Sequence, residues 1–189
     1  MNVSIEVSAR HLHITQSDLE VLFGEGYKLE PAKDLSQPGE FASTAEVSIV
    51  GPKDKLDNVR IVGPCRNHTQ IELSRTDCYH TGIDAPLRLS GKIIGSGACK
   101  LVGPAGELEL EEGVIVAKRH IHMNLAQAHQ LGVSNAQTVK VSVEGPRALV
   151  FDEVELRVKE EYDLSMHVDT DEANASGIKD KVFGEIIVT

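Results

Sequence analysis

The sequence predicts a mainly β protein with short helices, organised as one or two small β-barrels. Many short apolar runs follow one another along the chain, separated by Gly-Pro and Gly-x-Gly turns, and such spacing is typical of small barrels. Three of these runs end in Val-Gly-Pro, at Pro52, Pro64 and Pro104, where proline cannot continue a strand ladder. The phrase Arg-His-x-His also occurs twice, each time between an apolar run and a helix start, which indicates an internally repeated unit.

The expected strands are short runs rich in β-branched and other apolar residues. In chain order they are residues 3–7, 47–50, 59–62, 69–73, 100–102, 107–110, 114–116, 138–143, 148–151, 154–158 and 164–168. The runs at 3–7 and 114–116 lead into the two Arg-His-x-His segments. Those segments are therefore expected to continue a strand.

Three short helices are expected, each preceded by a side chain that can cap its N-terminus and followed by a glycine. They are residues 16–23 between Thr15 and Gly24, residues 125–131 between Asn124 and Gly132, and the segment 169–177, with Asp169 or Thr170 as the cap and Gly177 as the end. Asp18 occupies the capping-box position of the first helix. The first two helices follow the two Arg-His-x-His segments, which strengthens the case for a repeat.

No long linker or low-complexity stretch interrupts the chain, so two barrels would have to pack closely. Because the two Arg-His-x-His segments resemble each other, we expect them side by side in one discontinuous domain made of residues 1–44 and 116–189. Residues 45–115 would then form an inserted second β-barrel domain.

The composition indicates a soluble, enzyme-sized protein of 189 residues. Its formal net charge of −10 argues against binding to nucleic acid or to an anionic membrane, because both require a basic surface. The three cysteines are widely and irregularly spaced, and no signal peptide or membrane span is evident, so we expect reduced thiols and a cytoplasmic location. An anionic small substrate remains compatible with the charge if a few arginines or metal ions receive it.

The histidines of the two repeats are candidate metal ligands. They are His11, His13, His120 and His122. Because strand side chains alternate between faces, the two histidines of each repeat lie on one face, about 7 Å apart at Cβ, and can converge on a divalent ion. The residues between them, Leu12 and Ile121, would then face the core. The alternative is a surface pair or a hydrogen-bonded core pair in each repeat.

Two further residues are candidate ligands. Glu72 lies within an apolar strand, where burying a carboxylate is costly unless it is paired or coordinated. His167 follows an apolar strand face and precedes the acidic run at residues 169–172. From spacing alone, a solvent-facing Glu72 and a surface His167 are equally good interpretations. Cys65 is a further candidate for a place near the site.

Several segments together resemble the PduL-type phosphotransacylases, the phosphate propanoyltransferase family. They are Ser8-Ala9-Arg10-His11-Leu12-His13, Lys33-Asp34-Leu35-Ser36-Gln37-Pro38-Gly39, Arg66 with Thr69-Gln70-Ile71-Glu72, residues 114–123 (VIVAKRHIHM), and residues 166–174 from Met166 to Asn174. The segments occur in the order of the family and the resemblance covers residues 5 to 178.

The resemblance implies two closely packed β-barrels capped by α-helices, a homodimer, and a site with two zinc ions per chain. It implies that His11, His13 and Glu72 bind one ion. It likewise implies that His120, His122 and His167 bind the other, and that Arg66 binds phosphate. The implied reaction converts a short-chain acyl-CoA, propanoyl-CoA or acetyl-CoA, and phosphate into acyl phosphate and coenzyme A, as in propanediol degradation.

Three protein ligands per ion would leave coordination positions open, as in catalytic zinc sites. We expect direct attack by phosphate rather than an acyl-enzyme, because no Ser-His-Asp or Cys-His pair is evident and Cys65 is the one possible exception. The alternatives are a zinc-dependent thioester hydrolase and a non-catalytic, zinc-stabilised microcompartment protein. Family members usually enter microcompartments through an N-terminal helix that this sequence lacks. We therefore expect a free cytoplasmic enzyme, with association with a microcompartment through a targeting segment that lies elsewhere or was trimmed as the alternative.

Overall fold

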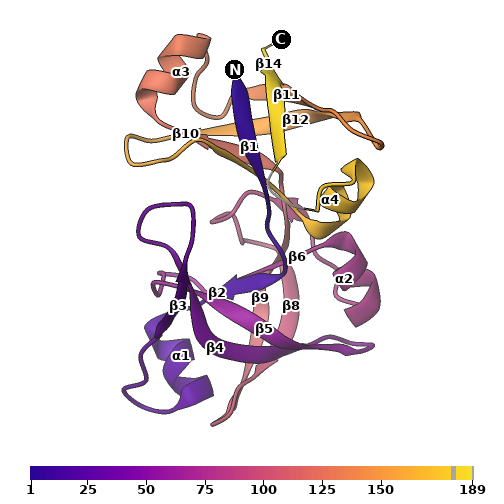
Figure 1. Ribbon diagram of the computed structural model, residues 1–189. Coiled ribbons are helices and arrows are strands. Elements are labelled where there is room, and N and C mark those ends of the chain that lie inside the picture. Colours follow the sequence, from indigo (N-terminus) through magenta and orange to yellow (C-terminus); the bar gives the residue numbers. More distant parts are fainter. Residues whose placement is uncertain (180–181, 189) are drawn as a thin grey trace. The chain divides into compact units, whose positions relative to one another are not determined.

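The computed structural model describes residues 1–179 and 182–188, and these form two compact units (Figure 1). The first unit comprises Met1–Ser8, Ser36–Pro38 and Lys118–Thr189, and the second comprises Ala9–Leu35 and Gly39–Ala117. Residues 180, 181 and 189, which fall within the expected first domain, lie outside the described residues.

The first unit is a closed barrel in which the N-terminal strand pairs with strands from the end of the chain. Its strands are β1 (Asn2–Val7), β10 (His120–Met123), β11 (Thr138–Val143), β12 (Leu149–Val158), β13 (Ser165–Val168) and β14 (Val182–Ile187). They are hydrogen-bonded in the order β1-β13-β10-β12-β11-β14, and β14 pairs with β1 to close the ring. Two helices, α3 (Leu125–Leu131) and α4 (Thr170–Ser176), belong to this unit.

The second unit also contains a closed ring of strands. Its elements are β2 (His11–His13), α1 (Gln16–Phe23), β3 (Pro31–Asp34), β4 (Phe41–Val50), β5 (Lys55–Gly63), β6 (Gln70–Leu73), α2 (Arg75–Thr81), β7 (Leu87–Arg88), β8 (Gly97–Val102) and β9 (Glu107–Ala117). Because β8 pairs with both β4 and β9, the ring runs β4-β5-β2-β6-β9-β8, with β3 and β7 added to it. The predicted fold class, mainly β barrels with short helices, is confirmed.

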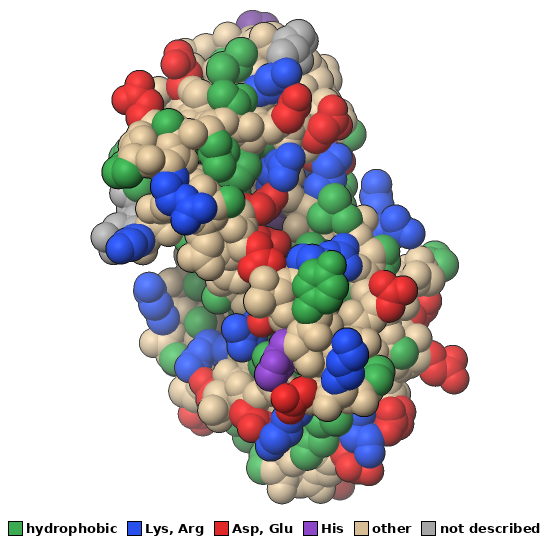
Figure 2. All heavy atoms as spheres, turned by 90° about the vertical axis from the view of Figure 1, so that its right-hand side faces the viewer, with side chains coloured by type: hydrophobic (Ala, Val, Ile, Leu, Met, Phe, Trp, Pro, Cys, Tyr) green, Lys and Arg blue, Asp and Glu red, His purple; other side chains and the backbone are tan. Residues whose placement is uncertain are grey.

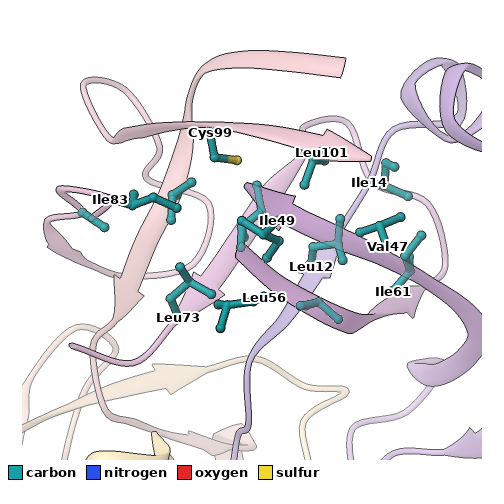
Figure 3. Close-up of a cluster of buried hydrophobic side chains, with 14 of the residues drawn as sticks. Leu12, Ile14, Val47, Ile49, Leu56, Ile61, Leu73, Ile83, Cys99 and Leu101 are labelled. Atoms are coloured by element: carbon teal, nitrogen blue, oxygen red, sulfur yellow. The ribbon is translucent and has the colours of Figure 1, made fainter. Parts of the chain in front are cut away.

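Each unit has its own hydrophobic core. Figure 3 shows side chains from the core of the second unit, among them Leu12, Ile49 and Leu101, which are fully buried. Ile121 is fully buried in the core of the first unit. Burying one such aliphatic side chain contributes about 1.5–3 kcal/mol. Leu12 and Ile121 therefore face the cores, as expected for the residues between the paired histidines.

The three helices expected from capping patterns are confirmed, with Asp169 rather than Thr170 as the N-cap of α4. A fourth helix, α2, was not expected. Its signals are nevertheless present in the sequence, because Ser74 and Asp77 form a capping box and Gly82 adopts the left-handed conformation that ends the helix.

Most expected strands are present, but their limits differ. The runs 107–110 and 114–116 belong to one strand, β9, because Gly113 with φ 139° lets the chain continue through the interruption. The runs 148–151 and 154–158 likewise form one strand, β12. Strands β3, β7 and β14 were not expected, and each Arg-His-x-His segment opens a new strand instead of continuing the one before it.

The division into units differs from the one expected. β1 pairs with β13 and β14, whereas β2, which follows it after three residues, pairs with β5 and β6. In the same way β9 belongs to the second unit and β10 to the first. The two His-x-His pairs consequently lie in different units. The chain changes unit directly before each Arg-His-x-His segment, and sequence periodicity carries no signal for such a long-range pairing.

Charged side chains of both signs are mixed on the protein surface. On the face drawn in Figure 2, Lys and Arg side chains are interspersed with Asp and Glu side chains. Exposed pairs such as Lys55–Asp57, at 2.9 Å, contribute about 0–1 kcal/mol each, so the cores dominate stability. Within residues 1–179 and 182–188, no helix has the length and hydropathy of a membrane span.

Candidate metal sites

Three of the candidate ligands meet in the second unit. The ligand atoms of His11, His13 and Glu72 all lie within 4.8 Å of one another. β2 pairs with β6 in a register that places His11 directly opposite Glu72, and His11 Nε2 lies 3.7 Å from Glu72 Oε2. The Glu72 side chain is 9% exposed, so the solvent-facing interpretation of this residue is wrong. We call this group the first triad.

The histidines of the first triad are oriented by backbone carbonyls. His11 Nδ1 lies 2.9 Å from the carbonyl oxygen of Ala9, and His13 Nδ1 lies 3.3 Å from that of Val62. Histidine ligands of metal ions commonly donate one ring N–H to such an oxygen, which fixes the other nitrogen as the ligand. The donor set of two imidazoles and a carboxylate fits zinc, leaving a coordination position open.

The remaining three candidates form a second triad in the first unit. The ring centroids of His120, His122 and His167 lie 4.7–5.2 Å apart. β10 pairs with β13 so that His120 faces His167, repeating the arrangement of His11 and Glu72 in the first triad. His120 Nδ1 lies 2.9 Å from the carbonyl oxygen of Lys118, again two residues earlier in the chain.

The second triad contains an unsatisfied histidine. Within the described part of the chain, both ring nitrogens of His122 are buried without a hydrogen-bond partner. Leaving a buried polar group without a partner costs about 1–3 kcal/mol, which a metal ion would offset. His167 Nε2 lies 3.0 Å from Ser165 Oγ. The second triad thus has the donors for a metal ion, although only in the first triad do the ligand atoms all lie within 4.8 Å of one another.

Two of the buried histidines, His13 and His122, are uncharged at neutral pH. Burial, together with the charges of His11 and Arg66, lowers the pKa of His13 from 6.5 to about 3. Burial, followed by the neighbouring His120 and His167, lowers the pKa of His122 to about 2. Only a neutral imidazole has a lone pair for a metal, so both side chains are ready to coordinate without first losing a proton.

Arg66, the expected phosphate ligand, lies in the same unit as the first triad. Its Nη2 donates to Glu40 Oε1 at 2.7 Å, and its Nη1 lies 3.4 Å from Ser90 Oγ. Its charge acts on the imidazole of His13. A guanidinium has five N–H donors, so these contacts leave donors for a second anion.

The sequence analysis assigned no role to several residues that surround the ligands. Gln70 donates to Glu72 Oε1 at 2.7 Å and to Ser90 Oγ at 2.8 Å, which fixes the carboxylate. The Tyr162 ring lies 4.3 Å from that of His122. Gln70 could have been inferred from the sequence, because it lies two residues before Glu72 on the same strand and therefore on the same face. Tyr162 lies in a loop, and no sequence pattern pointed to it.

The comparisons with known proteins identify one family. Residues 4–179 match the family model described as phosphate propanoyltransferase. Proteins named phosphate propanoyltransferase are similar to this chain. The one from Thermotoga maritima is 51% identical, and the match covers 92% of this chain and 83% of that relative. The one from Leptotrichia buccalis is 48% identical, and the match covers 96% of this chain and 86% of that relative. The relative from Clostridioides difficile is 44% identical over 98% of this chain and 88% of its own length. The resemblance inferred from the sequence motifs is thereby confirmed, and the chain belongs to the phosphate propanoyltransferase family, a family of acyltransferases.

Proposed function

We propose that this protein converts a short-chain acyl-CoA, propanoyl-CoA or acetyl-CoA, and phosphate into acyl phosphate and coenzyme A, and catalyses the reverse reaction. The observation that carries the proposal is the family match over residues 4–179. A convergent set of neutral imidazoles and carboxylate within the matched region supports it, because such a set suits a metal-assisted transfer to an anion.

Each triad is proposed to bind one zinc ion, giving two per chain. His11, His13 and Glu72 would hold one ion, and His120, His122 and His167 the other. The buried, unpaired nitrogens of His122 and the carbonyl-oriented ring of His11 support this assignment. Bound zinc supplies Lewis acidity, which stabilises a leaving thiolate and offsets the charge of phosphate.

Arg66 is proposed to orient phosphate through charge-assisted hydrogen bonds. A phosphate oxygen then attacks the thioester carbonyl carbon, the new C–O bond forms, the C–S bond breaks, and coenzyme A leaves as the thiolate. Gln70 holds Glu72 in place throughout, since its amide donates to that carboxylate. No side chain becomes acylated in this scheme.

Coenzyme A release from propanoyl-CoA and acetyl-CoA, measured with and without phosphate on the zinc-loaded protein, tests the proposal. We expect release to require phosphate and the metal count to approach two per chain. Release without phosphate would mean a thioester hydrolase. Bound zinc with no release under either condition would mean a non-catalytic, metal-stabilised protein.

Direct attack predicts that Cys65→Ala retains turnover within about threefold of the unsubstituted protein. Burial raises the pKa of the Cys65 thiol, and its Sγ lies 3.6 Å from Gln16 Oε1, so little reactive thiolate forms at neutral pH. Steady-state kinetics with a parallel zinc count check this. Abolished turnover with zinc still bound would indicate an acyl-cysteine intermediate instead.

A homodimer is proposed as the assembly, on the ground of the family resemblance. Sedimentation velocity of the zinc-loaded protein would give about twice the mass of the 20.5 kDa chain if this is correct. A sedimenting mass equal to that of one chain would contradict it.

A further inference from the structure

An arginine stands directly before each His-x-His pair and contacts the helix that follows the third ligand. Arg10 Nη2 lies 3.0 Å from Oδ1 of Asp77, a residue of α2. Arg119 Nη1 lies 2.6 Å from Oε1 of Glu172, a residue of α4. Each ion pair is contained within one unit. The pair is therefore duplicated together with the triads.

In each ion pair, one oxygen of the carboxylate contacts the arginine and the other accepts a hydrogen bond from the backbone N–H of the N-cap residue. Asp77 Oδ2 accepts the backbone N–H of Ser74, the N-cap of α2, at 3.3 Å. Glu172 Oε2 accepts the backbone N–H of Asp169, the N-cap of α4, at 3.1 Å. In both helices the other oxygen faces the arginine. A capping box and an ion pair thus share one carboxylate, and this combination occurs twice.

The capped helices begin immediately after the third ligands. Glu72 precedes the N-cap Ser74 by two residues, and His167 precedes the N-cap Asp169 by two residues. Each third ligand also faces the first histidine of its own triad across a strand pair. In each unit, two of the ligands lie on one strand, and the arginine stands at the start of that strand. The third ligand lies on the neighbouring strand, and the helix that follows this neighbouring strand carries the carboxylate. The ion pair consequently links the two ligand-bearing strands.

Arg119 has further contacts besides Glu172. Its Nε donates to the carbonyl oxygen of Asp152 at 2.7 Å, and its guanidinium carbon lies 5.7 Å from the centre of the Phe151 ring. Burial raises the pKa of Glu172, and Arg119 opposes that effect. In the other unit, the Asp77 side chain is 5% exposed. The Asp77 carboxylate therefore depends on a fixed partner, because an unpaired buried charge is costly.

We propose that Arg10 and Arg119 are positioning residues, each of which holds the strands of one triad at the spacing that binds a metal ion. They act through Asp77 and Glu172 and touch neither metal nor substrate in this role. The inference rests on the metal sites of the proposed function. Contacts beyond the direct ligands typically change metal affinity 10- to 100-fold, which sets the expected size of the effect.

Zinc affinity of the full chain, measured by competition with a chromophoric chelator, tests the inference. Arg119→Ala is expected to weaken one of the two zinc sites by roughly 10- to 100-fold and to leave the other unchanged. Glu172→Gln should weaken the same site, although glutamine at this position still completes the capping box. Arg119→Lys should give an intermediate affinity, because lysine keeps the charge but not both contacts of the guanidinium.

The double variant Arg119→Ala/Glu172→Gln should bind zinc no more weakly than Arg119→Ala alone, since both changes remove the same contact. Arg147→Ala, an exposed residue of the same unit, serves as the control and should leave both affinities unchanged. Unchanged zinc affinity in both Arg119→Ala and Glu172→Gln would overturn the positioning role while the proposed function stands. A wild-type protein that binds no zinc would overturn both the metal sites and this inference.

Discussion

Replacing His122 with glutamine is expected to remove one of the two zinc ions and to lower kcat/KM for phosphate-dependent coenzyme A release by roughly 10³-fold. Both nitrogens of this buried ring lack a hydrogen-bond partner among the described residues, and coordination of the proposed metal ion would supply one. Metal assistance contributes several kcal/mol to a transition state, and ~4 kcal/mol corresponds to about 10³ in rate. Steady-state kinetics and a metal count on the same sample measure both effects.

His129→Gln is the matched control. His129 lies in α3 of the same unit and its side chain is exposed, so the substitution should change neither the metal count nor the rate. Circular dichroism of the His122→Gln variant checks that the barrel remains folded. Retention of both zinc ions and of full activity in that variant would show that the second triad is not a metal site.

Arg66→Ala is expected to raise the KM for phosphate by roughly 10- to 150-fold with a much smaller effect on coenzyme A. This range corresponds to the loss of one charge-assisted hydrogen bond worth about 1.5–3 kcal/mol. The acyl-CoA carries its charge on groups other than the phosphate that Arg66 is proposed to bind. Arg66→Ala should therefore raise the KM for phosphate more than the KM for acyl-CoA. Initial rates in both reaction directions separate the two effects.

Glu40→Gln distinguishes the phosphate role of Arg66 from a structural one. Glu40 is the ion-pair partner of Arg66, so the substitution breaks the pair but keeps the guanidinium. If Arg66 binds phosphate, Glu40→Gln should leave the phosphate KM unchanged or lower it, because a competing anion is removed. An equal rise in the phosphate KM in both variants would mean that the ion pair, rather than phosphate binding, explains the effect.

Local signals predicted the elements of the fold better than their assembly. α3 could be located from Asn124 and Gly132 because capping is decided within a few residues. α2 carries equivalent signals at Ser74 and Gly82 and could have been found in the same way. The assignment of β1 to a barrel with β13 and β14 depends on pairing across most of the chain, and alternation along β1 does not encode it.

The site shows the same contrast. The His-x-His pairs were visible as a repeated phrase, and their alternation correctly placed Leu12 and Ile121 in the cores. Glu72 could not be separated from an ordinary surface glutamate until the register of β2 against β6 placed it opposite His11. Residues that support the ligands, such as Gln70, depend on side-chain geometry that a single sequence does not specify.

The chain passes from the first unit to the second and back, and this order of segments sets an order for folding during synthesis. The second unit is complete once Ala117 has been made, so its core can form early. The first barrel cannot close at that stage, because the partners of β1 are β13 and β14. At the usual rate of translation these partners emerge on the order of 10 s later. During that interval the edges of β1 lack these partners, and an unpaired strand edge can pair with another chain.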